Sequence, residues 1–158
     1  MDFSILFYIF ISMLPVIELR GGLPLAINYA LQNNIPIFLV FFLIVLSNIL
    51  VIFFIFYFLD NLQERLMKNS AYKKMFNFYI KKMQKKVDKF EKKYSSLGFL
   101  ALIIFVAIPF PGTGAWTGSL VSWILGLDRK KSIFSITLGV MIAGILVFLM
   151  MLGFLSLS

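Results

Sequence analysis

Two long stretches of this chain, residues 36–59 and 132–156, contain no charged residue and no proline after their first position. Built as helix, each would be about 36 Å long, enough to cross about 30 Å of hydrocarbon with some tilt. The chain is 61% apolar and 14% charged, whereas an ordinary soluble domain is about 45–50% apolar and about 25% charged. The sequence therefore predicts an all-α integral membrane protein with two transmembrane helices here.

Several residue types that carry chemistry are missing. The chain has no cysteine and no histidine, which excludes disulfides and thiolate sites and removes the commonest general base and zinc ligand. It also lacks the G-x-x-x-x-G-K-[ST] pattern of a nucleotide-binding loop. We therefore expect no enzyme, no metal site and no cofactor, and transport by this chain would be secondary rather than driven by ATP.

Two further apolar stretches, residues 3–31 and 97–127, are interrupted near their middle. Proline removes a backbone donor and glycine costs about 1 kcal/mol inside a helix, so each stretch should break near mid-depth. Non-helical backbone at that depth must be buried by protein or line a wet cavity. The interrupting residues are Pro15, Glu18, Arg20, Gly21, Gly22 and Pro24 in the first stretch, and Pro109, Pro111, Gly112, Gly114 and Gly118 in the second.

The positive charges indicate which ends face the cytoplasm. Residues 61–94 hold eleven Lys and Arg against three acids, and three more basic residues occupy 129–131. The positive-inside rule places both loops in the cytoplasm. Residues 97–127 then leave from and return to the same face. As helix they reach about 46 Å, less than the ~60 Å of two crossings, so we predict a re-entrant hairpin turning near Pro109–Gly114.

The N-terminal stretch follows the same logic from the other side, because its flanking loops lack basic residues. It should enter from outside and turn near Glu18–Pro24. The predicted fold is thus two inverted-topology repeats, residues 1–59 and 97–158, each a re-entrant broken-helix hairpin plus one transmembrane helix. A plain four-helix bundle with kinked first and third spans is the alternative, and it would put Arg129–Lys131 outside.

The linker between the repeats, residues 60–96, contains a basic amphipathic segment at 72–94. Its lysine-rich helix should lie on the anionic inner leaflet of the membrane. Packing of its apolar stripe on a second protomer, in a homo-oligomer, is the competing interpretation, and nucleic acid is not an expected partner. The stripe has helical spacing and consists of Tyr72, Phe76, Tyr79, Met83, Val87, Phe90 and Tyr94.

Glu18 and Arg20 are the only charges predicted inside the bilayer, where each would cost about 2.5–3.5 kcal/mol or more on a lone span. One interpretation is a neutralising ion pair that fixes the hairpin. The other is a functional centre, in which Arg20 contacts an anionic substrate group while Glu18 takes up and releases protons.

The second tip, residues 107–118, has no charge. It offers backbone groups, the hydroxyls of Thr113 and Thr117, and the indole of Trp116. Half-helices that begin after Gly22 and after Gly114 could direct their N–H groups at an anion. The alternative is that the Pro and Gly residues only shape a tight turn. Elsewhere, Asn48 should bond to a neighbouring helix or to the hairpin backbone, and Gly139 with Ala143 should allow close helix packing within the chain.

Three motifs together resemble the putative small multi-drug export protein family of bacteria and archaea. They are Glu18-Leu-Arg-Gly-Gly-Leu-Pro24, Pro109-Phe-Pro-Gly-Thr-Gly-Ala-Trp-Thr-Gly118 and Leu125-Gly-Leu-Asp-Arg-Lys130. The family is remotely similar to the DedA/VTT membrane proteins, which are thought to have paired re-entrant hairpins and to move lipids. DedA proteins typically carry an arginine in the second motif, and this chain has none there.

The expected function is a small secondary membrane transporter, with proton coupling as one option, that holds its substrate between the two hairpins. The alternatives are a DedA-like flippase for an anionic lipid such as polyprenyl phosphate, and a non-transporting scaffold that binds anionic lipid through residues 72–94. The predicted substrate-binding residues are Glu18, Arg20, Gly21, Gly22, Pro24, Pro109, Pro111, Gly112, Thr113, Gly114 and Trp116.

Overall fold

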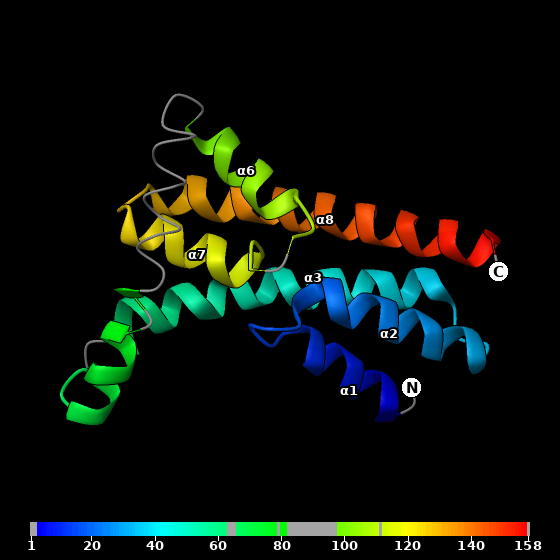
Figure 1. Ribbon diagram of the computed structural model, residues 1–158, viewed down its shortest axis with the longest axis horizontal. Coiled ribbons are helices and arrows are strands. Elements are labelled where there is room, and N and C mark those ends of the chain that lie inside the picture. Colours follow the sequence, from blue (N-terminus) through cyan, green and yellow to red (C-terminus); the bar gives the residue numbers. More distant parts are fainter. Residues whose placement is uncertain (1–2, 63–65, 79, 82–97, 111, 158) are drawn as a thin grey trace.

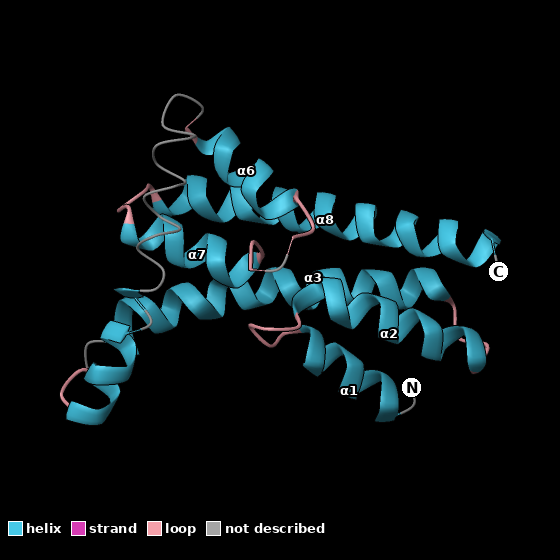
Figure 2. Ribbon diagram, viewed as in Figure 1, coloured by secondary structure: helices cyan, strands magenta, loops and turns pink. Residues whose placement is uncertain are grey.

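The computed structural model describes residues 3–62, 66–78, 80–81, 98–110 and 112–157. Every regular element within these ranges is a helix (Figures 1 and 2), which confirms the all-helical prediction. The labelled helices are α1 (Phe3–Ser12), α2 (Glu18–Gln32), α3 (Ile37–Tyr57) with a π-helical turn η1 (Phe58–Leu62), α6 (Phe99–Ala107), α7 (Ala115–Ile124) and α8 (Arg129–Leu157). Residues 70–78 form a further helical segment within the linker.

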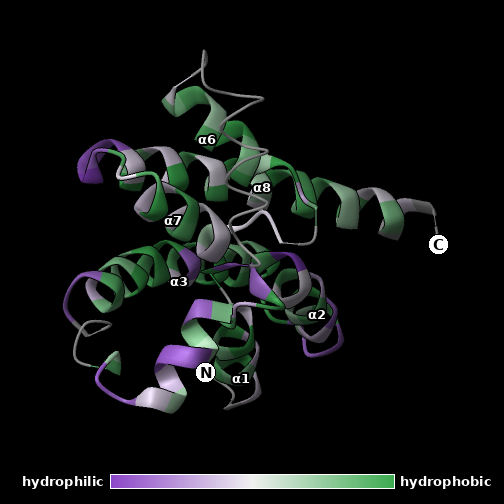
Figure 3. Cartoon of the chain, turned by 60° about the vertical axis from the view of Figure 1, so that its left-hand side comes forward, coloured by the Kyte–Doolittle hydropathy of each residue, from purple (hydrophilic) through white to green (hydrophobic). Residues whose placement is uncertain are grey.

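The two uncharged stretches form long helices, as predicted. Ile37–Asn61 and Arg129–Phe154 comprise 25 and 26 residues and are long and apolar enough to cross a membrane. Large apolar side chains on both helices face outward, including Phe38 at 70% exposure and Phe134 at 65%. Figure 3 shows hydrophobic residues along most of α3, α6 and α8. Such outward apolar surface matches a lipid environment and would be a liability in water.

The other four helices are short. The longest of them, α2, has 15 residues, and a helix of that length reaches only about 22 Å, so none of the four crosses about 30 Å of hydrocarbon by itself. In the second stretch the helix stops at Ala107 because Ile108 is extended ahead of Pro109, as residues before proline prefer. Gly112 then takes a φ of +80°, a conformation that glycine adopts without strain.

The first turn lies earlier than predicted, and this part of the sequence prediction was wrong. The chain turns at residues 13–17, which include Pro15, and Gly21, Gly22 and Pro24 all lie inside α2. Gly22 serves packing rather than turning, because a Cβ there would overlap the side chain of Ser12 on α1. α2 also continues through Pro24, although this residue cannot donate the usual backbone hydrogen bond to the fourth residue before it.

The helices form two antiparallel pairs beside the long helices (Figure 1). α1 and α2 pack together along one half of α3, α6 packs mainly on α8, and the turns of both pairs lie near the middle of the molecule. α2 also packs against α8, and α7 against α3, which joins the two halves through a main apolar core and a smaller second cluster between α3 and α7. Fully buried members of that core include Leu23, Ile44, Leu102 and Ile136.

Small residues set the approach of α6 to its neighbours. Val106 of α6 lies against Gly118 of α7 and Gly139 of α8, and a Cβ on either glycine would come within 2.6 Å of the valine side chain. The close helix approach predicted at Gly139 is therefore made within this chain.

The basic start of α8 contacts the end of α3 and the start of α6. Arg129 at the start of α8 is ion-paired with Asp60 in η1 and lies 4.0 Å from the ring centre of Phe56. Lys131 lies 5.6 Å from the ring centre of Phe99 at the start of α6. The end of α3 and the beginnings of α6 and α8 therefore share one end of the molecule.

Much of the predicted amphipathic segment at 72–94 lies outside the described residues. Its first two stripe members, Tyr72 and Phe76, are described, and their rings stack with centres 5.8 Å apart. Tyr79, Met83, Val87, Phe90 and Tyr94 lie outside the described ranges.

Candidate functional site

The turns of the two helix pairs contact each other through charged side chains of α2. Arg20 donates to the carbonyl oxygen of Val106, in the last turn of α6, at 3.2 Å, and also to the carbonyl of Phe110 in the following turn. The last carbonyls of a helix have no partner within it and form the negative end of its dipole. The guanidinium of Arg20 therefore satisfies and neutralises the end at which α6 is broken.

Glu18 lies at the beginning of α7, where its negative charge faces the positive end of the helix dipole. Its Oε1 accepts a hydrogen bond from the backbone N–H of Trp116 at 3.2 Å, and the residue is only 6% exposed. Gly114 precedes α7, and a Cβ there would overlap the Glu18 carboxylate, so glycine allows the acid to reach the helix end. A carboxylate at a helix N-terminus is stabilised by free N–H groups and by the positive end of the dipole.

Trp116 provides a third link between the turns. Its indole N–H donates to the carbonyl oxygen of Met13, in the first turn, at 2.9 Å. Trp116 thus binds the first helix pair both through its backbone, at Glu18, and through its side chain.

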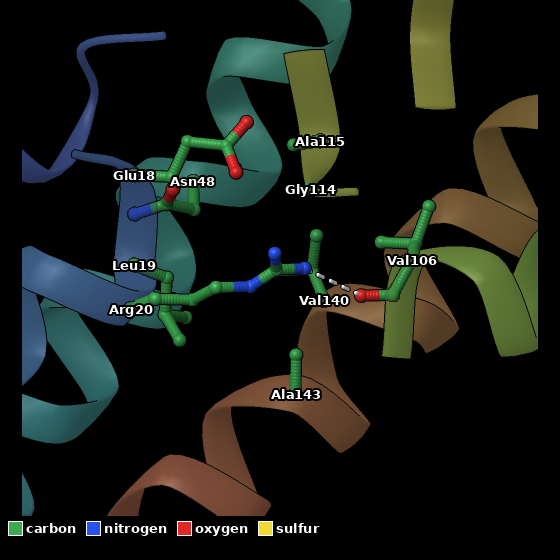
Figure 4. A pocket seen from close by; sticks show the side chains of 9 residues that line it. All are labelled: Glu18, Leu19, Arg20, Asn48, Val106, Gly114, Ala115, Val140 and Ala143. Atoms are coloured by element: carbon green, nitrogen blue, oxygen red, sulfur yellow. Dashed lines mark hydrogen bonds between the residues drawn. The ribbon is translucent and has the colours of Figure 1, made fainter. Parts of the chain in front are cut away.

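The two charges point to different parts of the second turn, as Figure 4 shows. The Arg20 side chain extends toward Val106, while the Glu18 carboxylate lies beside Gly114 and Ala115. Glu18 also has a positive φ of 48° at the start of α2, a conformation that is uncommon for residues other than glycine and often found at functional sites.

The space between these groups is small. A cavity of about 10 Å³ is lined by Glu18, Leu19, Arg20, Asn48, Val106, Gly114, Ala115, Val140 and Ala143. This is about the volume that one water molecule needs. In this conformation the tips are closed to any drug-sized molecule.

Asn48 connects α3 to the same region. Its side-chain amide is 2% exposed and donates to the Ser12 hydroxyl of α1 at 3.2 Å and to the carbonyl of Ile44 at 2.9 Å. The predicted bond from Asn48 to a neighbouring helix is confirmed, and it orders the end of α1 just before the first turn.

The remaining predicted residues shape the backbone. The Thr113 hydroxyl lies 2.8 Å from the carbonyl oxygens of both Ile108 and Phe110 and shares its single proton between them, which stabilises the second turn. A Cβ on Gly21 would overlap the Ile17 side chain. Pro109 lies in the second turn, and Pro111 lies outside the described residues.

The sequence could not reveal several partners in the site. The carbonyls of Met13, Val106 and Phe110 are backbone groups and carry no sequence signal. Ser12 is the last residue of α1 before the observed turn. It was not identified because the predicted turn lay too late in the chain. Within the described ranges no group of three or more acids could hold a metal ion.

The fold and the site together define an all-helical membrane protein with a charged centre between two pairs of short helices, in which Glu18 is buried and Arg20 is half-buried. Residues 18–146 match the family described as putative small multi-drug export protein, and the chain belongs to this family. The family name indicates a transporter. The match begins at Glu18, directly after the first turn, and contains Arg20 and the whole second turn. No curated protein and no solved structure matches the chain.

Proposed function

We propose that this protein is a secondary transporter of a prokaryotic plasma membrane, in which α1–α2 and α6–α7 are re-entrant hairpins that enter the bilayer from opposite sides. The length of the helices supports this topology, because helices of 10, 15, 9 and 10 residues are each too short to cross about 30 Å of hydrocarbon. The beginning of α6 lies beside the basic residue Lys131 at the beginning of α8, which fits a hairpin that returns to the cytoplasm.

The paired charges at the tips are the observation that carries the proposal. Glu18 and Arg20 are expensive to keep in a membrane interior, and such residues usually mark a pathway. Here they join the tips of the helix pairs α1–α2 and α6–α7, which have no covalent connection at this point. A substrate can pass only if these contacts open, because the closed cavity has room for about one water molecule.

Opening the tips would break a few hydrogen bonds, and these can form again when the tips close. Hydrogen bonds to charged groups contribute about 1.5–3 kcal/mol each, so the contacts of Glu18 and Arg20 are strong enough to favour closure and weak enough to be reversed. Protonation of Glu18 would remove its negative charge from the positive end of α7 and so favour opening. This provides a physical route for coupling transport to a proton gradient.

Transport by purified protein in liposomes tests the proposal. The probes are a cationic dye, ethidium, and an anionic dye, 1-anilinonaphthalene-8-sulfonate (ANS), each followed by fluorescence with an imposed pH gradient. The wild type should move at least one dye. Glu18→Gln and Arg20→Ala should each slow that transport about tenfold or more, since each removes a charged hydrogen bond worth ~1.5–3 kcal/mol from the closed state, to which the tips must return in every transport cycle.

Asp128→Asn is the matched control for loss of a carboxylate. Asp128 is exposed and caps α8 by accepting the Lys131 N–H at 2.9 Å, and asparagine caps equally well. This variant should transport at the wild-type rate. Wild-type transport by both Glu18→Gln and Arg20→Ala would contradict the proposed site.

A further inference from the structure

Trp116 also lines a second and larger cavity. It has a volume of about 340 Å³ and lies between the first turn, the end of α3, α7 and the helical segment 70–78. This volume falls within the range of about 300–1,000 Å³ that is common for small-molecule sites. The lining residues are Pro15, Ile55, Phe58, Leu59, Tyr72, Met75, Phe76, Trp116 and Leu120.

The walls of this cavity are apolar and rich in aromatic rings. No charged side chain lines it among the residues named above. The Tyr72 hydroxyl is neutral near physiological pH, as in any ordinary tyrosine, and burial raises its pKa further. Rings and methionine form adaptable contacts with apolar ligands of varied shape. The interior thus favours the apolar body of a ligand over its charged part.

The helical segment that contributes to one wall of the cavity is positively charged. This segment contributes Tyr72, Met75 and Phe76 to the wall, and the sequence from 66 to 81 carries four lysines and no acid. Lys73 and Lys74 lie on the same helical segment as the lining residues and are exposed. The acid nearest in sequence to the lining residue Leu59 is Asp60, and it is already paired with Arg129. A ligand that fills the cavity with its apolar body should therefore carry a negatively charged head group, which complements the positive charge of this segment.

We propose that this cavity binds an amphiphilic anion, with its aromatic or acyl body against Trp116 and Phe76 and its acidic head beside Lys73 and Lys74. A body pressing on Trp116 would act on both of its links to the first helix pair, at Glu18 and at Met13. That the bound anion is also the transported substrate rests on the proposed function, whereas its binding does not.

Energy transfer from Trp116 provides a reporter inside the cavity. The chain has two tryptophans, so the full-length Trp123→Phe variant keeps Trp116 alone. In phosphatidylcholine nanodiscs, Trp116 emission should be quenched saturably by ANS. N-phenyl-1-naphthylamine has the same rings without the sulfonate, and it should bind more weakly. Changing both Lys73 and Lys74 to Gln should weaken ANS binding about fivefold and leave the neutral dye unchanged, since exposed charges contribute little each.

Two phenylalanines on one helical segment provide a matched comparison. Phe76 lines the cavity, whereas Phe78 is 72% exposed and does not. Phe76→Ala should weaken ANS binding about tenfold, and Phe78→Ala should leave it unchanged. Equal effects of the two changes would overturn the assigned site. Equal binding of the neutral and anionic dyes would overturn the assigned ligand class.

The source of the natural anion is tested by exchanging the lipid. Displacement of ANS by phosphatidylglycerol nanodiscs would identify a membrane lipid as the anion, and retention of ANS would identify a free small molecule. Saturable binding by a wild type that transports no dye would keep this site and remove the proposed function. Dye transport without quenching of Trp116 would support the proposed function and contradict this site.

Discussion

At the scale of single residues, Gly114 shows how closely the two turns approach. A Cβ at this position would overlap three atoms of the Glu18 carboxyl group. The acid can reach the N–H of Trp116 only because residue 114 has no side chain. The sequence marked Gly114 as a turn glycine, but its contact with Glu18 depends on how the two helix pairs meet.

The change Gly114→Ala should therefore displace Glu18 and separate the turns. We expect a loss of about 1–3 kcal/mol in unfolding free energy, typical of overpacking, together with slower dye transport. Thermal unfolding in detergent measures the first effect. Gly153→Ala is the control, because no atom lies within 4 Å of a Cβ there. It should be neutral or slightly stabilising, and wild-type stability of Gly114→Ala would contradict the packing described.

Residue-level prediction succeeded where chemistry alone was informative. Glu18 and Arg20 stood out as the only charges in apolar sequence, and the structure brings both to the second turn. Their partners are carbonyl and N–H groups, which every residue possesses, so no pattern could identify them. Which residues contact a substrate stays a prediction.

At the scale of elements, the ion pair of Asp60 with Arg129 joins the end of α3 to the beginning of α8. Both side chains are partly exposed, at 41% and 37%, and exposed pairs contribute only about 0–1 kcal/mol. Arg129 also lies over the ring of Phe56, which adds a second favourable contact. The arginine should therefore contribute more stability than the acid.

A double-mutant cycle with Asp60→Asn and Arg129→Gln checks this. We expect a coupling of at most about 1 kcal/mol that decreases at high salt, and a larger single loss for Arg129→Gln than for Asp60→Asn. Unfolding of each variant in detergent supplies the values. A coupling of several kcal/mol, independent of salt, would contradict this estimate of the pair.

Element prediction depended on the kind of signal. The two long helices follow from length and lack of charge, and both were predicted nearly to their ends. The second break was also placed correctly, because Pro109 and Gly112 act through the backbone. The first break was misplaced, because Gly21 and Gly22 resemble a turn in sequence whereas Gly22 provides room for Ser12 of α1.

At the scale of the whole molecule, the proposed topology places the loop at residue 33 outside and residues 70 and 130 inside. The native chain has no cysteine, so single cysteines can be introduced without background. Asn33→Cys should react with an impermeant thiol reagent from outside intact cells, and Ser70→Cys and Lys130→Cys only after permeabilisation. Labelling of Lys130→Cys from outside would favour the four-span bundle instead.

The contact of Arg20 with the end of α6 and of Glu18 with the beginning of α7 has a direction. An interrupted helix presents a negative pole and a positive pole at its gap, and each must face the opposite charge. Exchanging the two residues, as Glu18→Arg with Arg20→Glu, would preserve composition and net charge. It would, however, place a negative charge at the negative end of α6 and a positive charge at the positive end of α7. Such a chain should fold less stably than one carrying neutral Gln at both positions, so here the order of two nearby residues matters more than their presence.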